Sequence, residues 1–505
     1  MSELEYTPIQ DIPTIIDDAR QFYKTGTTKE LAFRKQQLKQ VIRYLEDSEK
    51  GIENAVYSDL KKHRMEVLAE IAPVINECKY LIENLDRLAK PVSPKKLYWI
   101  NATDTTYVRK EPKGVVLVIG AWNYPVHLTL MPVVGAIAAG NCVILKPSEV
   151  ASHTAAFLTK TMSGYLDQRF FKIVNGAVDE TTALLDRPLD HIFYTGGGTI
   201  GSIVMGKAAK FLTPVTLELG GKSPTYVAPD AVNQCTANRI AWGKFYNNGQ
   251  TCVAPDYIIV QREHAESLVS ELQKTIKEFY GEYPEKSDSY GRIINHRQFD
   301  RLKKCLDSVD PATVVIGGQT NRDDLFIAPT VIYPATASGN PIMDNEIFGP
   351  ILPVVPVDNI DEAIDIINSK PHPLVTYIFS DKKKEINKVI EQSTSGGVLV
   401  NDTLMHILET SLPFGGVGAS GMGNYHGDKS FTTFSHERST MIKSTGLESV
   451  MGARYPPYNQ DKYNLFSVLI YGLPSSIVAK AQTIKTFLGS SVQVFFGSSS
   501  SQDTN

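Results

Sequence analysis

Apolar and polar residues follow a helical period in the first part of the chain. Between about residues 28 and 88, apolar residues recur every three or four positions among charged ones. This spacing gathers the apolar side chains on one helix face, so the segment is predicted to form several amphipathic helices. Two prolines in AKPVSPKK end the pattern, and the YWINATDTTYVRKEP that follows alternates enough to predict a β ribbon.

From about residue 114 the pattern changes to short, continuous apolar runs. Stretches with helical character separate the runs GVVLVIGAW, NCVILKP, HIFYTGG and PVTLELGG. The later runs YIIVQ, TVVIGG, PVVPV and LVTYIFS are of the same kind. Apolar runs spaced by helices are typical of parallel sheets that are covered on both faces. We therefore expect two α/β units in series, with a boundary near Gly220 and Gly221.

The composition narrows the class of protein. The chain has 505 residues, too many for one hydrophobic core, and a net charge of −4 without a basic cluster argues against a nucleic-acid partner. Its five cysteines are widely spaced and include no CxxC pair, which argues against disulfides or a thiolate zinc site and favours a reducing compartment. No HExxH or similar ligand cluster occurs, so no metal is expected, and the start MSELEYTPIQ does not resemble a signal segment.

One cysteine, Cys252, stands in the stretch FYNNGQTCVAPDY, which consists largely of small and amide residues. Such a turn presents a side chain rather than packing it in a core. A loop thiol becomes a good nucleophile when its pKa is lowered or a base lies beside it. No histidine lies within ten residues of Cys252, and taken alone a loop cysteine is more often structural than catalytic.

A glycine-rich turn lies between a predicted strand and a predicted helix. Gly196, Gly198 and Gly201 form a G-x-G-x-x-G, which would let the backbone approach a pyrophosphate, although such turns also serve packing. Glu218 in LELGG nearly fills the place of the acid that binds the adenosine ribose. The same carboxylate at a strand end could be a general base, or only a solvated acid or ion-pair partner. The residues alone leave these three roles open.

Two further polar sites follow predicted strands. Asn123 in AWNYPVHL could donate a hydrogen bond to a developing oxyanion, or be a turn residue before Pro125. Lys146 and Glu149 in KPSEV could hold a phosphate or ribose, or cap the next helix.

Six motifs in this order resemble the aldehyde dehydrogenase superfamily over about residues 10 to 445: WNYP, KPSE, LELGGKSP, FYNNGQTCVAPDY, NEIFGPILP and LPFGGVGASGMGNYHG. The APDY after the cysteine, FSHER and RYPPYN are similar to the class 3 branch, in particular to fatty aldehyde dehydrogenases of the fungal type. The resemblance implies an α/β fold, with a Rossmann-like NAD-binding domain, an α/β catalytic domain and a small β-ribbon oligomerisation arm. The implied limits are 1–218 with the arm near 96–112, 219–411 with the nucleophile, 412–445 for the return segment and arm, and 446–505 for a tail.

The resemblance also implies roles for the residues named above. Cys252 would be the nucleophile, Glu218 the general base and Asn123 an oxyanion donor. The implied cofactor is NAD, with NADP also accepted. The residues expected to bind it are Trp122, Lys146, Glu149, Gly196, Gly197, Gly198, Thr199, Ile200, Gly201, Leu219, Glu346 and Phe348.

The implied reaction is the oxidation of long-chain aliphatic (fatty) aldehydes to carboxylic acids, through a thiohemiacetal and a thioester on the cysteine. One alternative is an acylating enzyme that passes the thioester to coenzyme A, which the intact Glu218 argues against. A second alternative is a catalytically silent membrane-associated scaffold, which the joint presence of Asn123, Glu218 and Cys252 argues against. A cysteine hydrolase would leave the nucleotide turn and EIFGP without a purpose.

The tail is the part of the chain least constrained by these motifs. Its uncharged run ends at Lys480 and is interrupted by Gly472 and Pro474, so a membrane-spanning helix is not expected. The stretch SSIVAKAQTIKTFLG places apolar residues on one helical face with lysines beside it, which suits an interfacial helix on a membrane or lipid droplet. A helix docked on the protein itself or on a second subunit fits equally well. The resemblance implies a homodimer, and a tail that anchors the protein and covers the substrate entrance. The expected location is the cytosolic face of the endoplasmic reticulum or another lipid membrane.

Overall fold

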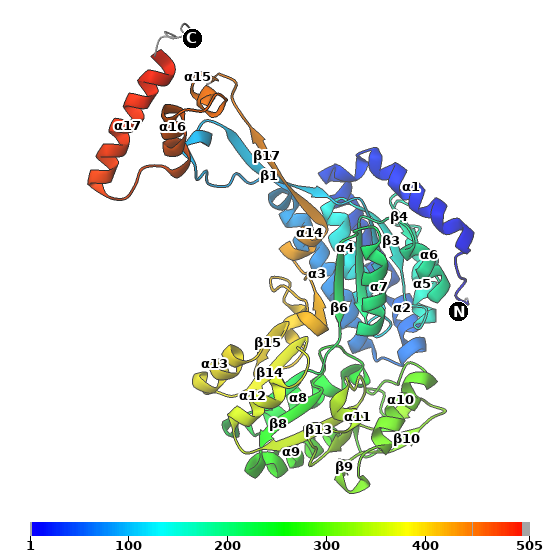
Figure 1. The fold of residues 1–505 in the computed structure, drawn as a ribbon. Coiled ribbons are helices and arrows are strands. Elements are labelled where there is room, and N and C mark those ends of the chain that lie inside the picture. The colour runs from blue at the N-terminus through cyan, green and yellow to red at the C-terminus, as the bar shows by residue number, and fades with distance from the viewer. Residues whose placement is uncertain (1–2, 447, 497–505) are drawn as a thin grey trace. The chain divides into compact units, whose positions relative to one another are not determined.

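The computed structural model describes residues 3–446 and 448–496. The chain divides into two compact units (Figure 1): Met1–Leu88 with Pro112–His436, and Ala89–Glu111 with Glu437–Asn505. Both predicted α/β units belong to the first of these.

Three N-terminal helices open the first unit, α1 (Ile12–Lys24), α2 (Leu31–Leu60) and α3 (Arg64–Ala89). The apolar positions that recur along α2, such as Leu38, Val41 and Leu45, are buried. α2 ends where Lys61 adopts a left-handed conformation with φ 54°, and its N–H closes the last turn on the Tyr57 carbonyl. The amphipathic helices expected from the sequence are therefore present. α2 packs against two helices of the first sheet, and α1 packs mainly against strands of that sheet.

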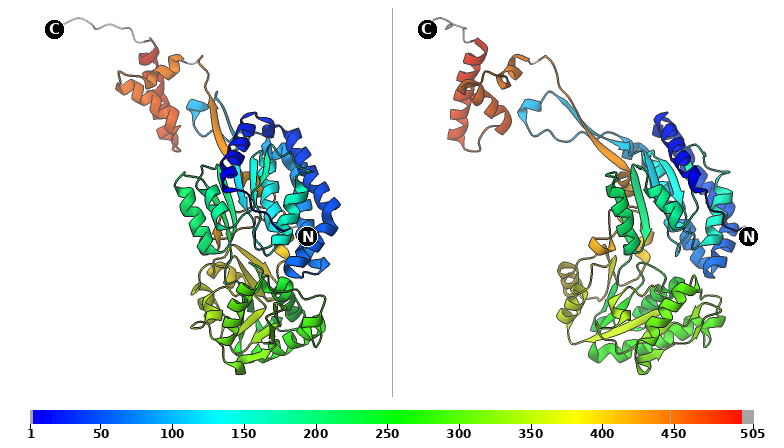
Figure 2. Two further views of the ribbon diagram at one scale, coloured as in Figure 1. Left: turned by 90° about the vertical axis from the view of Figure 1, so that its right-hand side faces the viewer. Right: turned by 45° about the vertical axis from the view of Figure 1, so that its right-hand side comes forward.

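The first sheet has the strand order β16-β6-β5-β2-β3-β4, in which β16 alone is antiparallel. Its strands are β2 (Val115–Ile119), β3 (Cys142–Lys146), β4 (Phe171–Ile173), β5 (His191–Gly196), β6 (Val215–Leu219) and β16 (Gly421–Met422). The helices α4 (His127–Ala139) and α5 (Ser152–Met162) lie with α2 on one face, and α6 (Val178–Leu185) and α7 (Gly198–Ala209) lie with α1 on the other (Figure 2). The strand order reverses between β2 and β5, which is the type of switch point where open α/β sheets bind ligands.

The second sheet has seven strands in the order β15-β14-β7-β8-β13-β12-β9. They are β7 (Pro224–Val227), β8 (Tyr257–Gln261), β9 (Val314–Ile316), β12 (Thr330–Ile332), β13 (Ile351–Val357), β14 (Val375–Phe379) and β15 (Gly397–Val400). β9 is antiparallel to β12 and the other pairs are parallel. The main helices are α8 (Gln234–Phe245) and α9 (Arg262–Tyr280) on one face, and α12 (Ile360–Asn368) and α13 (Lys383–Gln392) on the other.

The two sheets place different strand ends at the same region. β6 ends at Leu219 and β7 begins at Pro224, so the chain passes from the carboxyl edge of the first sheet to the amino edge of the second. Cys252 precedes β8, and Glu346 precedes β13. The loops that carry the sequence motifs therefore converge between the sheets.

The second unit contains a ribbon and a helical tail. β1 (Thr105–Pro112) pairs with β17 (Ser435–Ile442), where the sequence predicts a ribbon. The tail forms α15 (Glu448–Met451), α16 (Gln460–Tyr471) and α17 (Ile477–Phe496). α17 packs on α16, where Ser490 Oγ donates to Asp461 Oδ1 at 2.9 Å. Within residues 3–446 and 448–496, none of the helices has the length and apolar content that crossing a membrane requires.

Candidate active site

Cys252 follows a backbone turn of unusual conformation. The preceding residues Asn247, Asn248 and Gly249 all have positive φ, at 51°, 54° and 70°. A side chain on Gly249 would collide with the Gly349 carbonyl, so this position requires glycine. Left-handed residues other than glycine are uncommon and are found where surrounding contacts enforce them, often at functional sites.

The Cys252 thiol is half-buried and has its pKa raised. Burial is the main cause, and the charges of Glu346 and Glu218 add to it, while the backbone N–H groups of Cys252 and Val253 oppose it by donating to the sulfur. Without a bound cation or a working base, the residue is therefore a neutral thiol at physiological pH.

Glu218 lies near the carboxyl end of β6 and is 4% exposed. Neither carboxylate oxygen has a hydrogen-bond partner among the described residues. Burial raises the pKa of Glu218 well above its usual value. Its charge also raises the pKa values of Cys252 and Tyr425, so the three side chains share one electrostatic environment. An unpaired buried carboxyl beside a thiol is suited to exchange a proton there.

Asn123 lies in the turn between β2 and α4 and is 3% exposed. Its Nδ2 donates to the Gln250 carbonyl at 3.0 Å. The amide is thereby held against the cysteine loop, two residues before Cys252. The structure thus brings together the three residues for which the sequence predicts catalytic roles.

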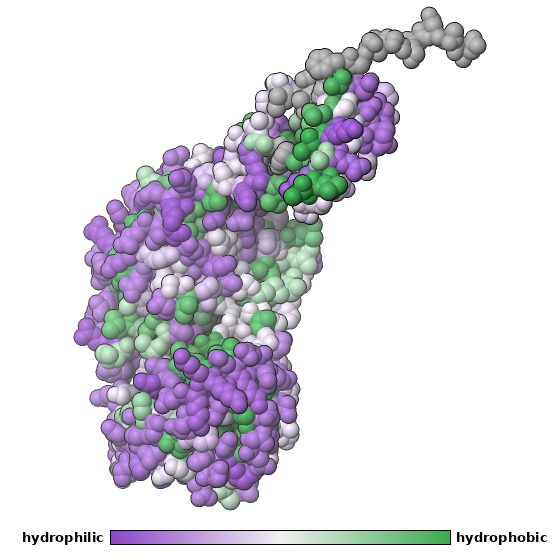
Figure 3. All heavy atoms as spheres, turned by 90° about the vertical axis from the view of Figure 1, so that its left-hand side faces the viewer, coloured by the Kyte–Doolittle hydropathy of each residue, from purple (hydrophilic) through white to green (hydrophobic). Residues whose placement is uncertain are grey.

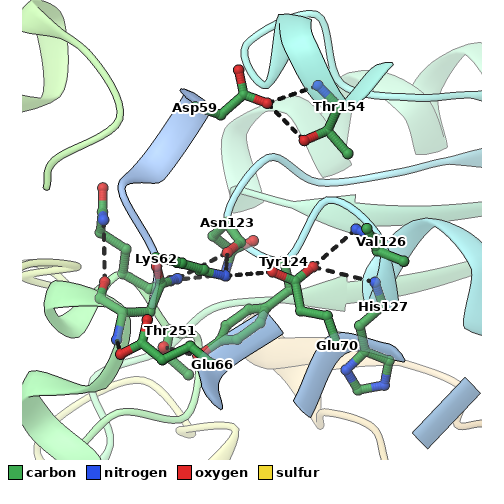
Figure 4. A network of polar contacts seen from close by, with 12 residues as sticks. Asp59, Lys62, Glu66, Glu70, Asn123, Tyr124, Val126, His127, Thr154 and Thr251 are labelled. Carbon is green, nitrogen blue, oxygen red and sulfur yellow. Dashed lines mark hydrogen bonds and ion pairs between the residues drawn. The ribbon is translucent and has the colours of Figure 1, made fainter. Parts of the chain in front are cut away.

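A buried polar network surrounds this turn (Figure 4). Lys62 Nζ donates to the Asn123 carbonyl at 2.7 Å and to Glu70 Oε1 at 2.6 Å. Asn247 Nδ2 donates to the same Asn123 carbonyl at 2.8 Å, and Glu66 Oε1 accepts the Asn247 N–H at 3.2 Å. Sequence reasoning missed this network. The signal was absent, because the exposed Lys61 and the buried Lys62 stand side by side in the same charged segment.

Aromatic and imidazole rings form a second group that the sequence analysis did not assign. Tyr425 and His426 contact each other and Phe414, with ring centroids 4.5 to 5.9 Å apart. Burial lowers the pKa of His426 to about 3, and neither of its ring nitrogens has a partner among the described residues. The ring is therefore neutral. Both residues stand in GMGNYHG, which is part of a motif that carries the family resemblance. This motif is the sequence signal that could have pointed to them.

The glycine-rich turn has the room that a pyrophosphate requires. Gly196 ends β5, Gly197 caps α7 and Gly198 is its first residue. A Cβ added at Gly197 or Gly198 would meet nothing within 4 Å, whereas one at Gly201 would lie 2.8 Å from Leu219 Cδ2. Gly197 and Gly198 thus leave open space at the N-terminus of α7, whereas Gly201 allows α7 to pack closely on β6.

Lys146 and Glu149 form an ion pair at the carboxyl end of β3, with Nζ and Oε2 2.5 Å apart. Thr199 and Ile200 lie in the first turn of α7, and the Ile200 side chain is 49% exposed. Both positions lie at the edge that holds nucleotides in open α/β sheets, and the donor set fits a dinucleotide.

Glu346 lies against Gly220, which directly follows β6, and Trp122 and Phe348 form an aromatic pair. Burial, with the Asp256 charge, raises the pKa of Glu346 to about 8, and its Oε1 has no partner among the described residues. Trp122 and Phe348 meet edge to face with centroids 5.4 Å apart. A ribose could satisfy the free carboxyl oxygen, so the predicted cofactor residues fit a nicotinamide dinucleotide.

Lys222 forms hydrogen bonds that hold the loop carrying Glu346. Its Nζ donates to Asp256 Oδ2 at 2.6 Å and to the Ile342 carbonyl at 2.5 Å, and Asp256 accepts the Ile347 N–H at 3.2 Å. The lysine of ELGGK is therefore structural here. Across the described part of the chain, no group of three or more His, Cys, Asp or Glu side chains could hold a metal ion.

The two α/β sheets and the cysteine, glutamate and asparagine between them can be compared with proteins of known family. The model of the aldehyde dehydrogenase family matches residues 2–440, and the chain belongs to this family. The chain is 47% identical to aldehyde dehydrogenase family 3 member A2 of Rattus norvegicus, over 88% of this chain and 91% of that protein. It is 47% identical to the dimeric NADP-preferring aldehyde dehydrogenase of Mus musculus, over 89% and 98%.

A solved structure agrees with this assignment. The substrate-bound state of Staphylococcus aureus AldH superposes with a TM-score of 0.86 at 40% identity, over 94% of this chain and 99% of that one. The protein has the aldehyde dehydrogenase fold, and its resemblance to the class 3 branch is confirmed. It is an NAD(P)-dependent oxidoreductase that oxidises aldehydes to carboxylic acids.

Proposed function

We propose that this aldehyde dehydrogenase oxidises long-chain aliphatic aldehydes at a membrane surface, with Cys252, Glu218 and Asn123 as its catalytic residues. The observation that carries the chemistry is the convergence of these three side chains between the two sheets. The Glu218 charge acts on Cys252, and the Asn123 amide is bonded to the loop that carries Cys252.

The first step is attack by Cys252. The Cys252 thiol gives its proton to the Glu218 carboxylate, which releases it to solvent. The sulfur then bonds to the aldehyde carbon, and the carbonyl oxygen becomes an oxyanion. Asn123 Nδ2, with its second N–H, and the Cys252 backbone N–H are the donors for that oxygen. One such donor is typically worth about 3–4 kcal/mol in the transition state.

Oxidation of this adduct leaves a thioester on Cys252, and a bound oxidised nicotinamide dinucleotide supplies the two-electron acceptor. Glu218 then removes a proton from water. The water oxygen bonds to the acyl carbon, the carbon–sulfur bond breaks, and Glu218 passes the proton it took from water to the sulfur as the carboxylic acid is released. Because the pKa of Glu218 is raised, the carboxylate is a stronger base than a solvent-exposed glutamate.

For the cofactor, we propose NAD in preference to NADP. A 2′-phosphate bound at the Lys146–Glu149 pair would lie close to the Glu149 carboxylate, and like charges repel each other. The kcat/KM with NAD divided by the kcat/KM with NADP tests this preference. Glu149→Gln should lower this ratio, and a wild-type ratio at or below one would contradict the proposal.

The membrane surface is proposed from α17. One stripe of this helix is apolar and exposed, including Ile477 at 84%, Leu488 at 59% and Val492 at 56% (Figure 3). Lys480 and Lys485 flank it, as in helices that lie on anionic lipid. The opposite side of the helix packs on α16 through Ser490, so this contact leaves the stripe uncovered. A long-chain aldehyde partitions into a bilayer at about 0.8 kcal/mol per CH₂, which places this substrate class at the same surface.

Flotation of the full chain with vesicles of phosphatidylcholine and phosphatidylserine tests the surface. We expect the wild type to float, and a variant with Ile484→Ser and Leu488→Ser to stay in the lower fraction. The matched control, Gln482→Ser with Thr486→Ser, alters the polar side of the same helix and should float. A wild type that does not float, or a stripe variant that floats equally well, overturns the membrane proposal. We propose the cytosolic face of the endoplasmic reticulum, or another lipid membrane, as the location. Fractionation of cells tests the membrane, and protease treatment of the intact membrane fraction tests the face, since a protein on the cytosolic face should be digested.

A homodimer is proposed from the apolar surface of the first unit. On and just after α7, Ile203 is 52% exposed, Met205 47% and Leu212 89%. The mouse relative named above is described as dimeric. Light scattering during size-exclusion chromatography should give twice the chain mass of 55.8 kDa, and a single-chain mass would contradict the proposal.

The activity itself is tested with hexadecanal and propanal, with reduced cofactor measured by absorbance. Wild type should turn over hexadecanal with the higher kcat/KM, and Cys252→Ala should have no activity on either. Equal or greater efficiency with propanal removes the long-chain assignment, and activity in Cys252→Ala removes the nucleophile. Product analysis with and without coenzyme A separates the free acid from an acyl thioester.

A further inference from the structure

Lys62 is a buried cation outside the residues that carry the proposed chemistry. It lies in the short turn between α2, which ends at Leu60, and α3, which begins at Arg64. The side chains of Lys62 and Glu70 are both 0% exposed, and their Nζ and Oε1 atoms are 2.6 Å apart. The ammonium also lies 3.9 Å from the centroid of the Tyr124 ring.

A buried ion pair of this kind is a poor source of stability. Removing two charges from water costs several kcal/mol for each ion, and apolar residues of the same volume often serve a core equally well. The pair therefore needs a reason other than stability, and its neighbours supply one.

The pair holds both ends of the turn that carries the oxyanion donor. Lys62 Nζ donates to the Asn123 carbonyl at 2.7 Å. The other oxygen of Glu70 accepts the N–H of Val126 at 2.9 Å and approaches the N–H of His127 at 3.5 Å. The Lys62 ammonium is therefore hydrogen-bonded to the start of the turn, and the Glu70 carboxylate is hydrogen-bonded to its end, where α4 begins (Figure 4).

We propose that Lys62, with Glu70, is a positioning residue for Asn123. The ammonium fixes the main chain of Asn123 and the Glu70 carboxylate fixes the following residues, so the amide is held against the cysteine loop before substrate arrives. The hydrogen bond from Asn123 Nδ2 to the Gln250 carbonyl then sets the direction of the amide plane. Geometry of this quality matters because a shift of about 1 Å in a positioned group can cost on the order of 10²-fold in rate. The inference rests on the proposed oxyanion role of Asn123.

The test is a double-mutant cycle. Lys62→Met with Glu70→Gln removes both charges together, and the amide oxygen that the second change introduces can still accept from Val126. We expect kcat to fall on the order of 10²-fold, as for Asn123→Ala. The KM values and the rate of Cys252 alkylation by iodoacetamide should stay within about twofold, because alkylation forms no oxyanion. In an Asn123→Ala background the same pair of changes should cost less than about threefold, because their effect is exerted through Asn123.

A matched control is Arg34→Met, which removes another buried cation at the opposite end of α4, where Arg34 donates to the Ala138 carbonyl. This variant should lose thermal stability and keep kcat. If the Lys62 and Glu70 variant does not fold, Glu70→Gln alone replaces it in the cycle, with a smaller expected loss of about tenfold.

The outcomes separate the inference from the proposed function. If Asn123→Ala keeps full kcat, the oxyanion role fails, and the inference fails with it. If Asn123→Ala loses activity but the Lys62 and Glu70 variant keeps it, or if the two losses multiply in the combined variant, only the positioning role is overturned.

Discussion

The hydroxyl groups of Tyr124 and Thr251 lie 2.6 Å apart and form a buried hydrogen bond. Tyr124 follows Asn123, the proposed oxyanion donor, and Thr251 precedes Cys252, the proposed nucleophile. The bond therefore joins the β2–α4 turn of the first sheet to the loop before β8 of the second, next to the two groups whose separation the proposed reaction depends on.

Deleting this bond should affect rate as well as stability. In Tyr124→Phe the Thr251 hydroxyl stays buried without its partner, which costs about 1–3 kcal/mol, and we expect kcat to fall about threefold to tenfold as the two loops separate. Thermal unfolding and steady-state kinetics measure the two effects. Tyr44→Phe is the control, since it removes a comparable bond to Thr161 Oγ1 at 3.0 Å between α2 and α5. Equal kcat in both variants would show that the bond is only structural.

The reactivity of Cys252 should increase with pH in the absence of cofactor. The thiol is the protonated form, and a raised pKa means that the thiolate appears at a higher pH than for an ordinary cysteine, whose pKa is about 8.5. The rate of iodoacetamide alkylation at Cys252, followed by peptide mass spectrometry, should therefore still be rising at about pH 9. Exposed Cys235 gives the reference profile within the same sample. A plateau at neutral pH would contradict the raised pKa.

Alanine substitutions at two glycines of the same turn should affect different properties, namely protein stability at Gly201 and cofactor binding at Gly197. Gly201→Ala places a methyl group 2.8 Å from Leu219 Cδ2, which overpacks the α7–β6 contact and should destabilise the protein by about 1 kcal/mol. Gly197→Ala enters open space at φ −76°, a conformation that alanine adopts freely, so stability should be unchanged. The KM for the cofactor should nevertheless rise about tenfold or more, because the methyl group occupies the space left for the pyrophosphate. Unfolding curves and cofactor titration distinguish the two, and an unchanged KM in Gly197→Ala would place the pyrophosphate elsewhere.

Glu66 should make stability depend on pH. Burial raises its pKa to about 7 in the folded protein, against 4.5 for the free side chain. The folded state then holds a proton that the unfolded state has lost, so this residue's contribution to stability falls as pH rises from about 4.5 to about 7. Glu66→Gln removes that loss and keeps an oxygen for the Asn247 N–H. We expect its melting temperature to exceed the wild-type value by more at pH 8 than at pH 5, and the same difference at both pH values would contradict the assignment.

Much of the fold and of the family assignment followed from local patterns. The helical period in the N-terminal segment and the apolar runs at β2, β3, β5 and β6 correspond to elements of the structure, because burial on one helix face or on both sheet faces is written into neighbouring residues. Short strands without such a pattern, such as β4 with three residues and β16 with two, were not anticipated. Their pairing comes from partners elsewhere in the chain.

The site shows the same division. The motif sequences predicted catalytic roles for Cys252, Glu218 and Asn123, since each stands in a short stretch whose residue types and order are specific to one family, and the structure brings the three side chains together. Only the tertiary structure distinguished buried Lys62 from exposed Lys61, and only it showed that no described residue forms a hydrogen bond with the Glu218 carboxyl. The physical reason is that desolvation and hydrogen-bond geometry depend on which distant segments pack together. Lys62 meets Asn123 across 61 positions of sequence, and no local pattern encodes that contact.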